Sequence, residues 1–276
     1  MRRITFLTGG FALVVTLASP AQQNRPADPP PGRLVDIGGR YLHLRCVGPA
    51  TGGPTVILEA GAGDYSNRWN AVQDLLAPRV RSCAYDRAGF GWSPGTQQSM
   101  AQDNADLRAL LTAASVASPY VLVGHSMGAL LVRRYANHYP NGIVGMVLLG
   151  PTHEDTRLFF PQDNQWKRVR EQPIPMGVEF QELYAARQAN PVPLGDRPLI
   201  VLAGTRADPN VSTPDDVARE KAAELEEQAR ISKNSKLLRD PLSGHHIHLD
   251  NPTLVANAIE EVVTAAMKGT RLGEPR

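Results

Sequence analysis

The chain has 276 residues, of which 42% are hydrophobic and 20% are charged, and its formal net charge is +2. A chain of this length can bury one large core, and this balance of apolar and charged residues excludes a wholly disordered protein. The small net charge, without a long run of Lys or Arg, indicates no surface for nucleic acid.

The N-terminus has the pattern of a secretory signal peptide. Arg2 and Arg3 precede an apolar run at 4–17, and small residues follow. This run is short for a membrane span. We therefore expect residues 1–21 to be a signal peptide that exports the chain to the periplasm or the exterior, with no stable membrane insertion of the mature chain. An uncleaved membrane anchor is the alternative.

A proline-rich stretch follows the signal peptide. Residues 22–32 contain three consecutive prolines, which predicts an extended linker. We assign residues 33–276 to a single folded domain.

Strand patterns and helix patterns alternate through this domain. Period-two alternation and continuous apolar runs predict strands, and helical leucine spacing predicts helices. The predicted strands are 40–47, 54–59, 80–85, 120–123, 143–149, 199–203 and 236–239. The predicted helices are 101–114, 129–139, 215–231 and 252–267. Such alternation predicts an α/β fold, with a mostly parallel central sheet flanked by helices.

The segment of about 152–195 interrupts this alternation. It is rich in proline, glutamine and aromatic residues and lies between two predicted strands. Ligands bind at the carboxyl edge of such sheets, so we expect this segment to form a small helical cap over that edge. An ordinary long crossover is the alternative.

A Gly-x-Ser-x-Gly motif at 124–128 follows an apolar strand and opens a helix. A nucleophile on so tight a turn needs small neighbours, because its backbone is strained and close to other chain. The helix N-terminus also favours developing negative charge. The motif therefore predicts a nucleophile elbow with Ser126 as the nucleophile.

Serine needs a base at neutral pH, and three histidines near the C-terminus are candidates. His245 follows Gly244 at the end of the last predicted strand and is the predicted base, with His246 and His248 as alternatives. These adjacent imidazoles lack the helical spacing of a zinc motif, and no acidic residue stands at a suitable spacing. We therefore predict no metal site from the three.

A third group must orient the base and stabilise its cation. Asp208 follows the end of a predicted strand and is the predicted acid, which completes a Ser-His-Asp triad. Glu154 and Asp155, after the preceding strand, are the rivals, and an aspartate before proline is also a common turn former. The chain order nucleophile, acid, base is typical of this kind of site.

An oxyanion intermediate needs two hydrogen-bond donors. The backbone N–H of Met127, directly after the predicted nucleophile, is one. The glycine-rich loop after strand 54–59 supplies the other, with Ala62 as the predicted donor and Gly61 or Gly63 as alternatives. A plain glycine turn is the competing interpretation.

With these motifs the chain resembles the serine hydrolases of the α/β-hydrolase fold over roughly residues 32–268. The matching segments are 59–63, 86–93, 124–128, and Gly244-His245 followed by Asp250-Asn251-Pro252. One departure is Ala60, which stands where the family usually has histidine. The resemblance implies that a pair of strands opens the sheet and that no cofactor is needed.

The resemblance also bears on the reaction. Dehalogenases and epoxide hydrolases of this family use aspartate where Ser126 stands, which disfavours an alkyl-enzyme. A serine nucleophile fits the cleavage of a small-molecule carboxylic ester or related acyl bond. Carbon–carbon bond hydrolysis of a diketone-type substrate and a non-catalytic binding protein are the alternatives. No oligomeric state is assigned.

Only two cysteines occur, Cys46 and Cys83, too few for a disulfide framework. In folds of this family the two strands that carry them are expected to be neighbours. Export would expose both thiols to oxidising conditions. A disulfide and two buried free thiols both stay open, because strand register is not readable from one sequence.

Overall fold

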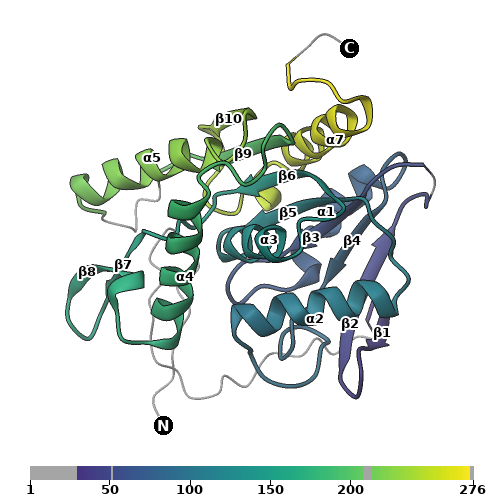
Figure 1. The fold of residues 1–276 in the computed structure, drawn as a ribbon, viewed down its shortest axis with the longest axis horizontal. Coiled ribbons are helices and arrows are strands. Elements are labelled where there is room, and N and C mark those ends of the chain that lie inside the picture. Colours follow the sequence, from purple (N-terminus) through teal and green to yellow (C-terminus); the bar gives the residue numbers. More distant parts are fainter. Residues whose placement is uncertain (1–29, 51, 208–212, 274–276) are drawn as a thin grey trace.

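A computed structural model describes residues 30–50, 52–207 and 213–273 of the chain (Figure 1). The predicted signal peptide at 1–21, and with it the prediction of export, lies outside these residues, as does most of the predicted linker. Among the described helices, none is both long and apolar enough to cross a membrane.

An eight-stranded sheet forms the centre of the fold. Its strands are, in spatial order, β1 (Arg33–Asp36), β2 (Tyr41–Val47), β4 (Ser82–Tyr85), β3 (Thr55–Glu59), β5 (Tyr120–His125), β6 (Ile143–Leu149), β9 (Pro198–Gly204) and β10 (Asn234–Asp240). From β4 to β10 all neighbours are parallel, whereas β2 runs antiparallel to both β1 and β4. The structure thus confirms the α/β fold and the opening pair of strands.

Helices cover both faces of the sheet, because its central strands are apolar on both sides (Figure 1). Ile57 of β3 belongs to the apolar cluster that includes α2 (Met100–Ala113), α3 (Met127–His138) and the end of α5 (Asp215–Ala229). Its neighbours in β3 point to the opposite face. There they pack with η1 (Ser66–Trp69), α1 (Asn70–Leu76), α6 (Ile247–Asp250) and α7 (Pro252–Lys268).

The predicted strands and helices are present, with bounds within two residues of the predicted ones. The residue patterns did not locate β1, which only the resemblance implied, and they missed α1 and the one-turn helix α6. Only Val35 of the four residues of β1 is buried, so this edge strand lacks the alternation of apolar and polar residues by which strands are recognised. Helix α1 has seven residues, too few for a clear helical pattern.

The predicted cap segment contains a helix, as expected, and also a two-stranded hairpin that the sequence analysis did not predict. It contains β7 (Arg157–Phe160), β8 (Gln165–Arg168), η2 (Val169–Glu171) and α4 (Pro175–Ala189). Phe160 and Phe180 are buried in one apolar cluster with Leu130 and Leu131 of α3. The segment therefore packs on the helix that begins at the nucleophile motif.

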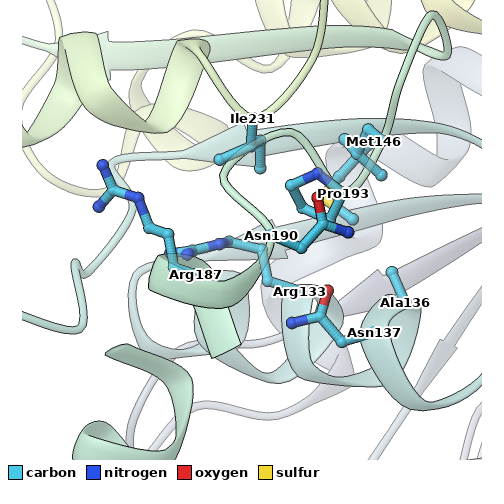
Figure 2. Close-up of a pocket in the computed structure, with 9 residues that line it drawn as sticks. Arg133, Ala136, Asn137, Met146, Arg187, Asn190, Pro193 and Ile231 are labelled. Atoms are coloured by element: carbon cyan, nitrogen blue, oxygen red, sulfur yellow. The ribbon is translucent and has the colours of Figure 1, made fainter. Parts of the chain in front are cut away.

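A buried carboxylate ties the cap to the core. Glu154, fully buried after β6, accepts hydrogen bonds from Arg133 of α3 at 2.7 Å and from Arg187 of α4 at 3.1 Å. Burial by itself would raise the pKa of Glu154, but the charge and the hydrogen bond of Arg133, together with the neighbouring His153, outweigh burial and hold the pKa well below its usual range. Both arginines also line a small hollow between α3 and the chain after α4 (Figure 2).

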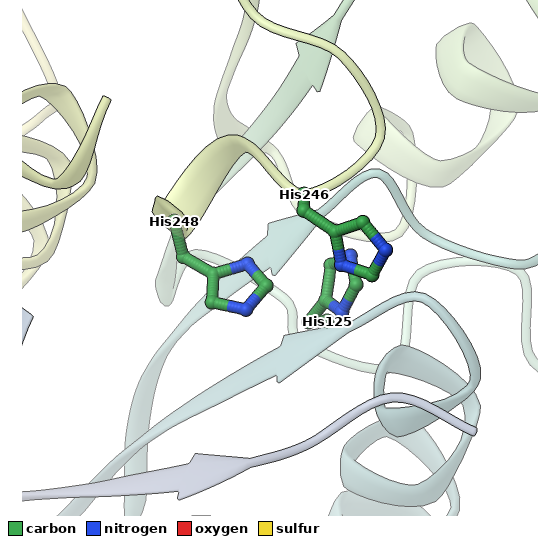
Figure 3. Close-up of side chains that lie close together, drawn as sticks. All are labelled: His125, His246 and His248. Atoms are coloured by element: carbon green, nitrogen blue, oxygen red, sulfur yellow. The ribbon is translucent and has the colours of Figure 1, made fainter. Parts of the chain in front are cut away.

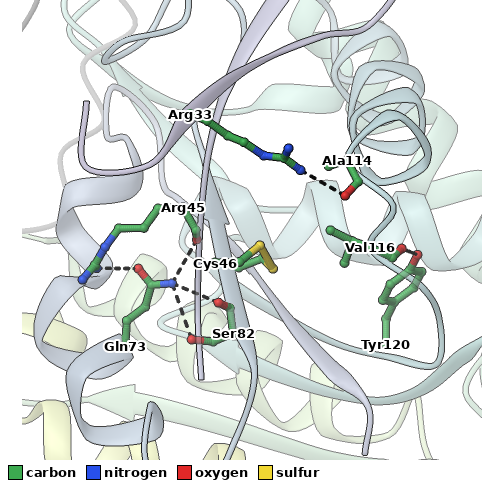
Figure 4. The surroundings of a disulfide bond; sticks show 9 residues. Arg33, Arg45, Cys46, Gln73, Ser82, Ala114, Val116 and Tyr120 are labelled. Atoms are coloured by element: carbon green, nitrogen blue, oxygen red, sulfur yellow. Dashed lines mark hydrogen bonds between the residues drawn. A yellow bond between two sulfur atoms is a disulfide. The ribbon is translucent and has the colours of Figure 1, made fainter. Parts of the chain in front are cut away.

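Cys46 and Cys83 form a disulfide in the structure, which answers the question that the sequence analysis could not decide. Cys46 of β2 and Cys83 of β4 are directly opposite in the antiparallel pairing, with Cα atoms 4.1 Å apart, and their sulfurs are bonded (Figure 4). Beside them, the Gln73 amide of α1 donates to the backbone carbonyls of Arg45 and Ser82. One helix side chain thereby braces both strands that the disulfide joins.

Replacing both cysteines by alanine should lower the free energy of unfolding by about 2–4 kcal/mol, because the bridge closes a loop of considerable length in the unfolded chain. Denaturant unfolding of oxidised wild type and the double variant measures this difference. Under reductant the two proteins should become nearly equal in stability. Two free thiols in denatured, unreduced protein would contradict the disulfide.

Candidate active site

Ser126 lies on a strained turn between β5 and α3. Its backbone has φ 52° and ψ −120°, a conformation that L residues rarely adopt. A side chain at Gly124 would come within 2.5 Å of the Gly128 carbonyl oxygen, and one at Gly128 within 2.6 Å of the Ala60 carbonyl oxygen, so each motif glycine is needed for its own close approach. The Ser126 N–H donates to the carbonyl of Leu149 in β6 at 2.9 Å, which fixes the turn against the next strand.

His245 reaches the serine from the loop after β10. Its Nε2 lies 3.0 Å from the Ser126 Oγ, a hydrogen-bond distance. Burial, with the neighbouring imidazoles of His125 and His246, lowers the pKa of His245 well below its ordinary value. The ring is therefore neutral near pH 7, the state in which a histidine can accept the proton of a serine.

The other two candidate histidines occupy different places. His246 is half-buried, with Nδ1 3.9 Å from the Asp64 carboxylate, and His248 is buried against the ring of Trp69. Among the hydrogen bonds of the described residues, the one to Ser126 Oγ comes from His245. The structure thus brings together the serine and the histidine that the sequence paired.

Three residues to which the sequence analysis assigned no role, His125, Asp250 and Arg206, hold the histidine loop. The ring of His125, the residue before the nucleophile, hydrogen-bonds through Nε2 to the carbonyl oxygen of His245 at 3.0 Å. Since a carbonyl can only accept, Nε2 carries the proton. Asp250 accepts from the Gly244 N–H at 2.7 Å and from Arg206 at 2.9 Å. His125 lies within the predicted motif, whereas nothing in the sequence marked Arg206.

The predicted acid, Asp208, lies outside the described residues. Residues 205 and 206, which precede it, lie along the loop that carries His245. The N–H groups of Thr205 and Arg206 donate to the carbonyls of Asp240 and Ser243, each at 2.9 Å. Position 206 is thus fixed next to the segment that carries His245.

The two rival acids are engaged elsewhere. Glu154 pairs with Arg133 and Arg187, as described above. Asp155 pairs with Arg168 at 2.8 Å and with Arg170. Within the described ranges, neither carboxylate makes a hydrogen bond to the His245 ring.

The predicted oxyanion donors lie on the two segments that flank the serine. Met127 is the first residue of α3, and Ala62 is in the loop after β3. A side chain at Gly61 would come within 3.4 Å of the Ser126 Cβ, so this loop lies against the nucleophile. In the described part of the chain, neither the Met127 nor the Ala62 N–H donates to a protein acceptor. Both are therefore available to an oxyanion.

Arg87 fixes the loop after β3, which contains Ala62, through hydrogen bonds to its backbone. Its guanidinium donates to the carbonyls of Ala60 and Gly61 at 2.8 and 2.7 Å and pairs with the buried carboxylate of Glu59. The planar fork of arginine can serve several acceptors at fixed angles, which a lysine cannot do. Arg87 comes from the 86–93 segment, which resembled the family, but its role was not predicted.

The Arg87→Lys variant tests this positioning role. We expect the rate constant for labelling of Ser126 by a fluorophosphonate to fall about tenfold to a hundredfold, because the donor at Ala62 would lose its fixed position. Arg79→Lys, at an exposed arginine, is the matched control. Unchanged labelling in an Arg87→Lys protein that melts like wild type would show that Arg87 does not position the loop.

Comparison with known proteins agrees with this architecture. Residues 54–200 match the family model described as alpha/beta hydrolase fold. An uncharacterized protein, YqjL, of Bacillus subtilis is 33% identical over 229 residues, which cover 78% of this chain and 85% of that protein.

Solved structures with low identity share the fold. A thermophilic esterase from Thermogutta terrifontis superposes with a TM-score of 0.58 at 22% identity, covering 83% of this chain and 94% of the esterase. An ancestral haloalkane dehalogenase superposes with a TM-score of 0.64 at 17% identity, covering 86% of this chain and 99% of the dehalogenase. The family-model match, the B. subtilis relative and the shared topology together show that this chain belongs to the α/β-hydrolase fold family.

Proposed function

We propose that this protein is a serine hydrolase that cleaves a carboxylic ester or a related acyl bond. Ser126 is the nucleophile, His245 the base and Asp208 the acid that orients it, and the N–H groups of Met127 and Ala62 form the oxyanion hole. The observation that carries the proposal is the 3.0 Å contact between Ser126 Oγ and His245 Nε2 at a strained strand-to-helix turn.

The geometry supports a two-step acyl transfer. Ser126 Oγ attacks the acyl carbon while its proton passes to His245, and the oxyanion binds the two N–H groups. Collapse breaks the ester bond, and the alcohol leaves with the proton from His245. Water, deprotonated by the same histidine, then hydrolyses the acyl-enzyme and releases the acid.

The serine at position 126 favours acyl chemistry over the reaction of a haloalkane dehalogenase, although such an enzyme shares the fold. The structural similarity to the Thermogutta esterase agrees with the proposal. The Cys46–Cys83 disulfide supports export, because disulfides persist in oxidising compartments.

Assays with a chain-length series of aryl esters test the reaction. Ser126→Ala and His245→Ala should each reduce kcat by about 10⁴-fold or more, and the double variant should lose little further activity. A protein that cleaves a coloured vinylogous diketone but no ester would be a carbon–carbon hydrolase. A folded protein that reacts with neither substrate nor fluorophosphonate would be a binding protein.

The same assay identifies the acid through a matched pair. Asp208→Asn should fold normally and lower kcat by about 10³–10⁴-fold. Glu154→Gln should instead lower the free energy of unfolding by about 3 kcal/mol, because two arginines lose their buried partner, and the folded fraction should keep its activity. A reversal of these two results would move the acid to the segment after β6.

The lowered pKa of His245 predicts the acid limb of the pH profile. A base must be neutral to act, and a lowered pKa keeps His245 neutral to lower pH. We therefore expect kcat/KM to hold as pH falls through about 6.5, the ordinary pKa of histidine, and to decline only below it. Stopped assays from pH 4 to 9 measure the profile, and an acid limb at or above pH 6.5 would contradict the prediction.

A further inference from the structure

Three imidazoles outside the Ser126–His245 pair gather beside it. His125, His246 and His248 each offer a ring nitrogen, and these nitrogens lie within 4.8 Å of one another (Figure 3). His125 is at the end of β5, whereas His246 and His248 lie at the start of and within α6. The group therefore exists only because the fold joins segments about 120 residues apart.

One nitrogen of each ring in this cluster lacks a hydrogen-bond partner in the described part of the chain. The Nδ1 atoms of all three rings are buried and make no hydrogen bond within the described residues. On His125 the proton is on Nε2, so its Nδ1 is a bare lone pair. Buried polar atoms are nearly always satisfied, and three unsatisfied imidazole nitrogens in one cluster indicate a partner that is not part of the polypeptide.

We propose that His125, His246 and His248 form a binding site for a divalent cation of the Zn²⁺ type. Imidazole nitrogens suit Zn²⁺, Cu²⁺ and Ni²⁺, whereas Mg²⁺ and Ca²⁺ prefer oxygen. Bonds of about 2.0–2.1 Å require the nitrogens to approach one another to roughly 3.4 Å. His246 is half-buried, so its side chain has more room to move than those of the buried His125 and His248.

Two further features fit a metal site. Ligating histidines usually donate their other ring N–H to a carbonyl or carboxylate, as His125 does to the His245 carbonyl. The Asp64 carboxylate has one oxygen bonded to Arg68 at 2.8 Å and its other oxygen 3.9 Å from the His246 Nδ1, where it would serve as a fourth ligand. The sequence analysis predicted no metal site from His245, His246 and His248. In the folded chain the third member of the cluster is His125, from a distant segment, and not His245.

The location gives the cation an effect on the proposed reaction. The ring centroids of His125 and His245 are 4.7 Å apart. A double positive charge bound to His125 would therefore lie near His245 and oppose, by Coulomb repulsion, the positive charge that this ring takes up in the proposed reaction. Occupancy should therefore inhibit hydrolysis, and this consequence rests on the proposed function.

Binding is tested on the whole, chelator-treated protein without substrate. Titration with Co²⁺ should give the visible absorption bands of a low-coordinate nitrogen site, and calorimetry with Zn²⁺ should give one ion per chain. His246→Ala and His248→Gln should weaken binding at least tenfold. His138→Ala, at a half-exposed histidine at the end of α3, is the matched control and should bind like wild type.

The result that overturns the site is the absence of stoichiometric binding, or equal binding by the His246→Ala and His138→Ala proteins. Thermal unfolding provides a check on folding, since Zn²⁺ should raise the melting temperature of wild type and not of His246→Ala.

An activity measurement tests the location. Zn²⁺ should lower ester turnover in wild type and His138→Ala, but not in His246→Ala, each relative to its own metal-free rate, and chelator should reverse the effect. Stoichiometric binding without inhibition would overturn the placement beside His245. The binding measurement needs no substrate, so a failure of the proposed hydrolysis would be seen separately from a failure of the metal site.

Discussion

The close contact between the start of α3 and the end of β3 is the constraint on which the site depends. A side chain at Gly128 would come within 2.6 Å of the Ala60 carbonyl and 2.7 Å of the Glu59 carbonyl. Backbone therefore packs directly on backbone. Because of this contact, Ser126 projects from a turn with positive φ and the loop containing Ala62 lies beside it. Any larger residue at 128 would separate Ser126 from the loop that contains Ala62.

Buried ion pairs fix the elements around this contact. Under the oxyanion loop, Glu59 accepts from Arg87 and from the Tyr85 hydroxyl, and burial is the main reason that its pKa is raised. Under the cap, Glu154 accepts from Arg133 and Arg187. Buried ion pairs of this kind add little net stability compared with apolar packing, but losing one partner is costly. Their effect here is to fix the positions of a loop and of helix α4.

The proposed hydrolase and the proposed metal site share one structural element. His125 hydrogen-bonds to the carbonyl of His245 and also belongs to the imidazole cluster. A cation bound there would act on the base through the same ring that holds its backbone in place. The residue directly before the nucleophile thus connects catalysis with a candidate inhibitory site.

Local sequence patterns were sufficient to predict the succession of the longer strands and helices along the chain. They also located the strained turn at Ser126 and the loop that carries His245. Each of these depends on residues close together in the chain. Apolar period and length distinguish strands such as β3 from helices such as α7. Glycines flanking Ser126 mark a strained turn wherever they occur between a strand and a helix.

Tertiary structure alone decided the features that join distant segments. Strand register placed Cys46 opposite Cys83, and a shift of one residue would have turned one thiol to the other face. The packing of α3 and α4 brought Arg133 and Arg187 to Glu154. The end of β5 lies beside α6, and this placement brought the three imidazoles together. Such contacts depend on how whole elements pack in three dimensions, and neither propensity nor spacing along the chain encodes that arrangement.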